Sequence, residues 1–150
     1  MRELPKPLQV YVVEESPIIR RLLASTIEAA GAELIGHSTD ASSAITDLWS
    51  LRPDLILIDV RLKSGSGFDV LEALQALDPK PPAIKVVLTN HASEEFRSLS
   101  FRLGANGFFE KGSETSQVLA LISALASEKR RRWNLPNGPS HSLRENDSRK

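Results

Sequence analysis

Residues 52–74, RPDLILIDVRLKSGSGFDVLEAL, decide the fold of this chain. The strongly apolar run Asp54–Ile58 has the length of a strand and lacks polar alternation, which is typical of a strand buried on both faces. The Lys63–Gly67 loop follows it. The apolar residues after that loop recur at the spacing of one helix face: Val70, Leu71, Leu74 and Leu77. The stretch therefore predicts a buried strand, a loop and a helix.

The same strand-then-helix pattern recurs on both sides of this stretch. The other strands are predicted at Leu8–Val13, Glu33–Ser38, Ile84–Leu88 and Gly107–Glu110. Ser16 and Pro17 suit the cap and first turn of the first helix. The buried helix faces are predicted to be Ile19, Leu22, Leu23, Thr26, Ile27 and Ala30; Ala41, Ala44, Ile45, Leu48 and Trp49; Phe96, Leu99 and Leu103; and Val118, Leu121, Ile122 and Leu125. Strict alternation predicts an α/β fold, a doubly wound five-stranded parallel sheet with five helices.

Composition indicates one ordinary globular domain. The chain has 150 residues, of which 41% are hydrophobic and 25% charged. We expect the domain to span residues 1–132 and residues 133–150 to form a flexible polar, basic tail, because Pro, Gly, Ser and Asn dominate there. The absence of cysteine excludes thiol-based zinc, haem and redox sites.

Net charge and hydropathy limit the kinds of partner and the cellular location expected for this chain. The formal net charge is zero, so no overall field draws the chain to nucleic acid or to an anionic membrane, and neither partner is expected. The apolar runs are strand-sized, and the first residues lack the apolar core of a secretory signal. A cytoplasmic location is therefore predicted.

Five polar side chains directly follow the predicted strands: Glu14, Glu15, Asp59, Thr89 and Lys111. Ligands of open parallel sheets bind beyond the carboxyl ends of the strands, so these side chains are expected to converge. Converging carboxylates repel each other, and a divalent cation would relieve that repulsion. An added lysine suits a phosphoryl anion.

Four motifs in this order carry a family resemblance: VVEESPIIRRLL, RPDLILIDVRLKSGSGFDVLEAL, VVLTN and ANGFFEKG. They resemble the receiver domain of bacterial response regulators, the CheY-like family, over about residues 8–127. The resemblance implies strand order 2-1-3-4-5. It also implies a stand-alone regulator that takes a phosphoryl group from a histidine kinase or phosphotransferase. No enzymatic activity is expected beyond the regulator's own aspartyl phosphorylation and dephosphorylation.

The resemblance also assigns roles to residues of this chain. The predicted catalytic residues are Asp59, Thr89 and Lys111. Mg²⁺ would be held by Glu14, Glu15, Asp59 and the backbone carbonyl of Arg61. The switch pair would be Thr89 and Phe108, and the residues modulating phosphoryl lifetime would be Arg61, Asn90 and His91. Output would be a contact with a downstream protein, or with a second copy, through the face of the fourth helix, fifth strand and fifth helix.

Several positions depart from the family pattern. Glu15 stands where aspartate is usual, and its extra methylene should weaken Mg²⁺ binding because the ion demands near-ideal octahedral geometry. Asn90 replaces a small residue and Gly112 replaces a proline. Lys63 stands in a loop that commonly carries a proline.

Three other interpretations compete with a phosphorylated receiver. A pseudo-receiver, an interaction module independent of phosphorylation, is favoured by Glu15 and Asn90. A flavin-binding protein of the same topology would need a Gly/Ser-rich phosphate loop after the first strand, which this chain lacks. Accessory nucleic-acid binding would rest on the basic run Glu128–Trp133, although basic residues also suit the carboxyl end of a helix.

Overall fold

Residues 6–77 and 82–138 are described by the computed structural model, and they alternate between strands and helices along the chain. The strands are β1 (Gln9–Val13), β2 (Glu33–Ser38), β3 (Leu55–Ile58), β4 (Ile84–Thr89) and β5 (Gly107–Glu110). The helices are α1 (Pro17–Ala29), α2 (Ala41–Ser50), α3 (Gly67–Ala76), α4 (Glu94–Arg102) and α5 (Thr115–Asn134). All strand pairs are parallel and lie in the order β2-β1-β3-β4-β5, which confirms the predicted fold class and strand order.

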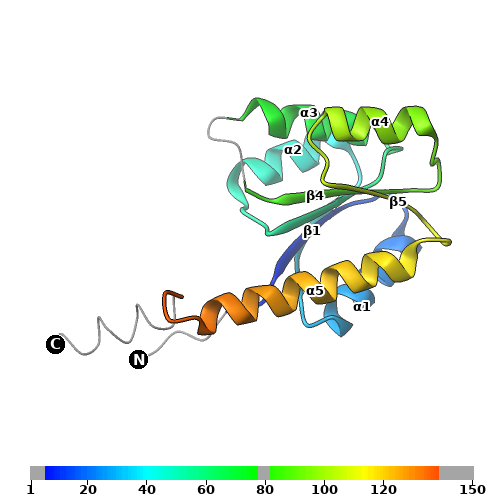
Figure 1. The fold of residues 1–150 in the computed structure, drawn as a ribbon. Coiled ribbons are helices and arrows are strands. Elements are labelled where there is room, and N and C mark those ends of the chain that lie inside the picture. Colours follow the sequence, from blue (N-terminus) through cyan, green and yellow to red (C-terminus); the bar gives the residue numbers. More distant parts are fainter. Residues whose placement is uncertain (1–5, 78–81, 139–150) are drawn as a thin grey trace.

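Two hydrophobic cores hold the three layers together. Alternate residues of the central strands face opposite sides of the sheet, as the period of a strand requires. Tyr11, Ile56 and Ile58 pack with residues of α2 and α3 on one side. Val12 and Leu57 pack with residues of α1 and α5 on the other. Figure 1 shows α2, α3 and α4 above the sheet and α1 and α5 below it.

Side-chain caps begin four of the helices. The caps are Ser16, Asp40, Ser66 and Ser93, and each side chain accepts a hydrogen bond from the backbone N–H three residues later. Ser66 and Asp69 form a reciprocal capping box at the start of α3. These caps fix where the four helices start, in the loops that follow β1, β2, β3 and β4.

Two predicted core residues are exposed instead. Leu22 is 60% exposed and Trp49 is 67% exposed, whereas their helix neighbours Leu23 and Leu48 are buried. The apolar stripe of each helix is wider than the strip that the sheet and adjacent helices cover. Both residues lie at the outer edge of their stripes, so helical spacing alone placed them wrongly.

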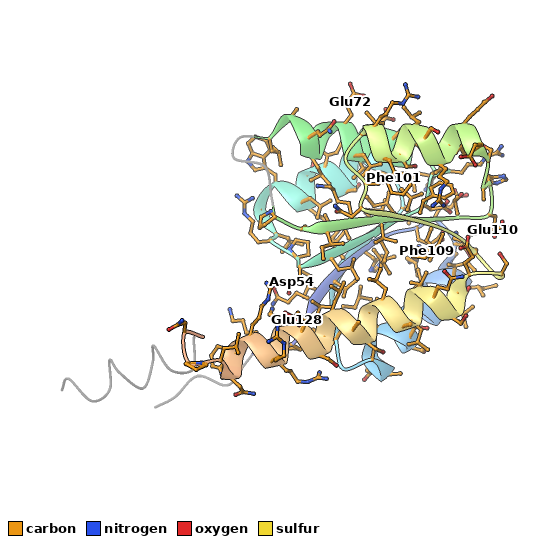
Figure 2. The ribbon with its side chains drawn as sticks, in the orientation of Figure 1. Asp54, Glu72, Phe101, Phe109, Glu110 and Glu128 are labelled. Carbon is orange, nitrogen blue, oxygen red and sulfur yellow. The ribbon has the colours of Figure 1, made fainter. Side chains whose placement is uncertain are left out.

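The last helix ends later than predicted. It continues to Asn134, two residues beyond the predicted domain boundary, and residues 139–150 of the predicted tail lie outside the described residues. The Lys129 ammonium anchors this extension, because its Nζ lies 2.7 Å from Asp54 Oδ2 and 3.2 Å from the Pro7 carbonyl oxygen. Figure 2 shows Asp54 and Glu128 at the end of the sheet that α5 runs past.

Within the described ranges, none of the helices combines the length and apolar character that a membrane span requires.

The core makes a direct prediction for stability. Leu71 is fully buried between α3 and the sheet, so Leu71→Ala should lower the free energy of unfolding by about 2–5 kcal/mol through lost burial and the cavity left behind. Urea denaturation measures the change. Leu22→Ala is the control, because exposed substitutions usually cost under about 0.5 kcal/mol. Equal losses for the two variants would contradict this account of the core.

Candidate functional site

Three charged side chains meet at the carboxyl edge of the sheet. Glu14 follows β1, Asp59 follows β3 and Lys111 follows β5. The Lys111 ammonium donates to Asp59 Oδ2 at 2.7 Å and also to Glu14 Oε1. The side chains of Lys111, Asp59 and Glu14 are only 9%, 10% and 3% exposed. One cation therefore lies between two buried carboxylates, as the order of the strands predicted.

The backbone ladder fixes these positions beyond the ends of the strands. The Asp59 N–H donates to the Val13 carbonyl at 2.9 Å, and the Lys111 N–H donates to the Thr89 carbonyl at 3.0 Å. Pairing between neighbouring strands thus extends one residue into the loops. The side chains of Glu14, Asp59 and Lys111 are consequently held by the sheet rather than by mobile loops.

Burial of Glu14 and its pairing with Lys111 shift the Glu14 pKa in opposite directions. Burial raises the pKa of its carboxyl above the ordinary value, while the hydrogen bond and charge of Lys111 lower it. The Ser16 backbone N–H also donates to Glu14 Oε2 at 3.2 Å and favours the charged form. The nearby Asp59 carboxylate raises the Glu14 pKa again, so the two acids compete for one ammonium.

The second carboxylate oxygen of Asp59, Oδ1, has a different environment from Oδ2. Asp59 Oδ1 is buried and has no hydrogen-bond partner among the described residues. Buried polar atoms are nearly always hydrogen-bonded, and one left unpaired costs free energy. Oδ1 can therefore serve as a nucleophile towards phosphorus or as a ligand of a cation, either of which would occupy its lone pairs.

A glycine brings α3 close to Asp59. A Cβ on Gly67 would lie 2.2 Å from the Asp59 carbonyl oxygen and 2.9 Å from Ile58 Cγ2. Only glycine fits this contact with the backbone. The first turn of α3 thereby packs directly against the residue that carries the site.

Thr89 and Phe108 both lie inside the molecule. Thr89 is fully buried, and its Oγ1 accepts a hydrogen bond from the His91 N–H at 3.1 Å. Phe108 is 5% exposed. The expected switch pair thus occupies adjacent strands, because Thr89 ends β4 and Phe108 lies in β5.

Arg97 holds Phe108 from outside, a role that the sequence patterns did not indicate. Its guanidinium lies 5.9 Å from the Phe108 ring centre and 5.3 Å from that of Phe101, and it donates to the Phe108 carbonyl at 3.4 Å. The helical i,i+4 spacing of Arg97 and Phe101 is visible in the sequence. The contact with β5 depends on how α4 packs and has no sequence signal.

Other predicted site residues point outward. Glu15, Arg61, Asn90 and His91 are all exposed. Within residues 6–77 and 82–138, no group of three or more histidine, cysteine or acidic side chains is arranged to hold a metal ion. The structure therefore brings Glu14 and Asp59 together without Glu15.

Arg20 is a second residue that sequence reasoning missed. Its guanidinium donates to the carbonyl oxygens of Glu14 and Glu15, both at 3.2 Å. This contact fixes the backbone of the acidic loop against α1. An arginine one turn into the helix was the available signal, but the same spacing suits a solvated side chain.

Comparison with known proteins identifies the family. Residues 10–123 match the response regulator receiver domain, and the chain belongs to this family. It is 31% identical over 129 residues to the protein-glutamate methylesterase/protein-glutamine glutaminase 2 of Vibrio vulnificus (strain YJ016), covering 84% of this chain and 37% of that protein. It is also 31% identical over 119 residues to the nitrate/nitrite response regulator protein NarP of Escherichia coli (strain K12), covering 79% and 54%. The chain thus spans only part of the length of these relatives.

A solved structure agrees with this assignment. The Mn²⁺-bound form of response regulator Rcp1 superposes with a TM-score of 0.68 at 25% identity, covering 81% of this chain and 93% of that one. The family and the fold expected from the motifs are confirmed.

Removing the shared ammonium should destabilise the site. Lys111→Met leaves two buried carboxylates unpaired, and we expect the free energy of unfolding to fall by about 3 kcal/mol near neutral pH. The loss of Lys111 raises the Glu14 pKa further. A carboxyl whose folded-state pKa exceeds its unfolded-state pKa loses stability as pH rises through that interval, so the deficit should grow with pH.

Urea unfolding at several pH values measures this deficit. The double variant Lys111→Met/Glu14→Gln should recover part of the loss, because only one carboxylate then lacks a counter-charge. A deficit that is the same at every pH would contradict the assignment of the pair.

Proposed function

We propose that this receiver domain accepts a phosphoryl group on Asp59 from a histidine kinase or phosphotransferase. The observation that carries the proposal is the Asp59 carboxylate. One of its oxygens is bound by Lys111, and the other is buried and has no hydrogen-bond partner in the described part of the chain. The Asp59 carboxylate is therefore oriented by Lys111 and keeps one oxygen that could attack phosphorus.

The proposed reaction is a displacement at phosphorus. An Asp59 oxygen forms the new O–P bond while the P–N bond of a phosphohistidine breaks, and the imidazole leaves with the electron pair. Phosphoryl transfer depends mainly on positioning and neutralising charge. Lys111 is placed to neutralise the phosphoryl oxygens, and the buried Thr89 hydroxyl would donate to one of them.

Receiver domains generally bind Mg²⁺, and the donor set of this site suits that ion. Mg²⁺ favours one or two protein carboxylates with water and phosphate oxygens, which Asp59 and Glu14 would provide. Asp59 Oδ1, which is buried and accepts no hydrogen bond from the described residues, fits a cation. Glu15 and the Arg61 carbonyl are proposed as further ligands. When bound, the ion would neutralise charge on the transferring phosphoryl group.

A surface for the phosphodonor lies beside the site. Ile18 and Leu22 are 69% and 60% exposed and lie one turn apart on α1. This helix starts directly after the Glu14–Ser16 loop. Exposed apolar side chains on the helix that follows this loop suit docking of a kinase or phosphotransferase.

Output is proposed through the face formed by α4, β5 and α5. A phosphoryl group on Asp59 would form a hydrogen bond with Thr89, which ends β4. Phe108 lies in the neighbouring strand β5, opposite Val87. Arg97 connects that ring to the exposed Phe101 on α4, which Figure 2 labels. A change at Phe108 would thereby reach the surface that a downstream protein contacts.

Two alternatives are less well supported. A pseudo-receiver is favoured by the outward Glu15 and Asn90, yet Asp59, Thr89 and Lys111 are all retained and buried together. Nucleic-acid binding by the basic end of α5 is weakened because three of its cations are paired. Lys129 pairs with Asp54, and Arg131 and Arg132 pair with Glu128.

Phosphorylation from a small donor tests the proposal. With acetyl phosphate and Mg²⁺, the protein should gain one acid-labile phosphoryl group, and Asp59→Asn should gain none because the nucleophilic carboxylate is gone. Intact-protein mass spectrometry measures the gain. Asp69→Asn is the matched control. It should be labelled like the unchanged protein, because the Asp69 side chain belongs to the capping box at the start of α3 and not to the Asp59 cluster. Equal labelling of Asp59→Asn would refute the assignment.

Replacing Glu15 tests the metal ligands. We expect Glu15→Asp to tighten Mg²⁺ binding several-fold, because the shorter side chain suits the octahedral geometry that the ion demands. NMR shifts of the Asp59 and Glu14 amides during Mg²⁺ titration report the affinity. Glu28→Asp, on the far end of α1, should leave it unchanged. Unchanged or weaker binding by Glu15→Asp would remove Glu15 from the proposed ligands.

A further inference from the structure

A groove on the opposite edge of the molecule takes no part in the proposed function. It lies between the carboxyl ends of α2 and α3 and has a volume of about 610 Å³. Those helices end just before β3 and β4 begin, so the groove lies at the amino edge of the sheet. Asp59 lies at the other edge, beyond the roughly 13 Å that a four-residue strand spans. We call this surface the Trp49 groove, lined by Ile45, Trp49, Arg52, Ala73, Leu74, Ala76 and Leu77.

Trp49 projects from the wall of the groove. It is 67% exposed although it is among the largest apolar side chains of the chain. Tryptophan is enriched among the residues that dominate binding energy in interfaces. On α3, Ala73 and Ala76 line the groove with methyl groups only. The same surface thus carries a protruding ring and an apolar space large enough to receive one.

Arg52 adds a charge to this surface. Among the described residues that line the groove it alone is charged, and none of the described carboxylates pairs with it. A guanidinium is attracted to the negative face of an aromatic ring, and most strongly to that of tryptophan. Arg52 is therefore suited to an incoming indole.

We infer that the Trp49 groove binds a second copy of this chain about a two-fold axis, with each Trp49 entering the groove of its partner beside Arg52. A two-fold interface must be complementary to itself, and this surface supplies the ring, the space and the cation together. A peptide that filled only the groove would leave the outward face of Trp49 exposed. A second copy would cover both.

The expected dimer is weak and independent of phosphorylation. Stable interfaces bury about 800 Å² per partner, more than one groove and one indole provide. We therefore expect a dissociation constant of about 10–500 µM. The Asp59 site remains open at the far edge, so the inference does not rest on the proposed function, and Asp59→Asn should dimerise like the unchanged protein.

Sedimentation equilibrium of the full chain over increasing concentration tests the inference. Trp49→Ala should weaken dimerisation at least tenfold, and Ala76→Glu should do the same by filling the groove while Trp49 is retained. Trp49→Phe should retain part of the affinity. Ile18→Ala is the matched control, because Ile18 is 69% exposed but lies on the other side of the sheet, and it should dimerise normally.

Fluorescence gives a second readout. In a Trp133→Phe background, emission from Trp49 should shift to shorter wavelength as concentration rises, because the indole becomes buried. Circular dichroism checks that each variant is folded. A chain that remains monomeric up to about 1 mM overturns the inference. Dimerisation that survives Trp49→Ala and Ala76→Glu, or that is lost only in Ile18→Ala, overturns it equally.

Discussion

The ammonium of Lys111 between Glu14 and Asp59 is the interaction on which the carboxyl edge of this molecule depends. Two carboxylates that are almost fully buried repel each other, and a low-dielectric surrounding strengthens that repulsion. The positive charge of Lys111 offsets this repulsion. Lys111 follows β5, which is separated by β4 from the strand that precedes Asp59. The same lysine is therefore the structural counter-charge of both carboxylates.

The parallel sheet separates two surfaces with different chemistry. Its carboxyl edge gathers Glu14, Asp59 and Lys111, which are held by ladder hydrogen bonds that continue past the strands. Its amino edge carries the apolar Trp49 groove and the anchored end of α5. Because every strand runs in the same direction, the residues that follow the strands and those that precede them lie at opposite edges of the sheet.

Much of the fold and part of the site could be predicted from the sequence. Apolar runs such as Leu55–Ile58 and helical spacing such as Val70, Leu71 and Leu74 identify elements because the periods of strands and helices differ. The site residues Glu14, Asp59 and Lys111 could be grouped because parallel strands place their carboxyl ends together. These conclusions need only local pattern and the topology that the pattern implies.

Residue spacing along the chain was sufficient to predict the strands and helices, their alternation and the acid–lysine cluster. Which residues of a pattern are buried became clear only from the packing of the elements against each other. Glu15 and Trp49 occupy positions that the patterns placed in the site and in the core, yet both are exposed. Arg97 reaches Phe108 only because α4 packs beside β5. Exposure and contact between distant segments depend on the relative placement of whole elements, which the local periodicity of a sequence does not specify.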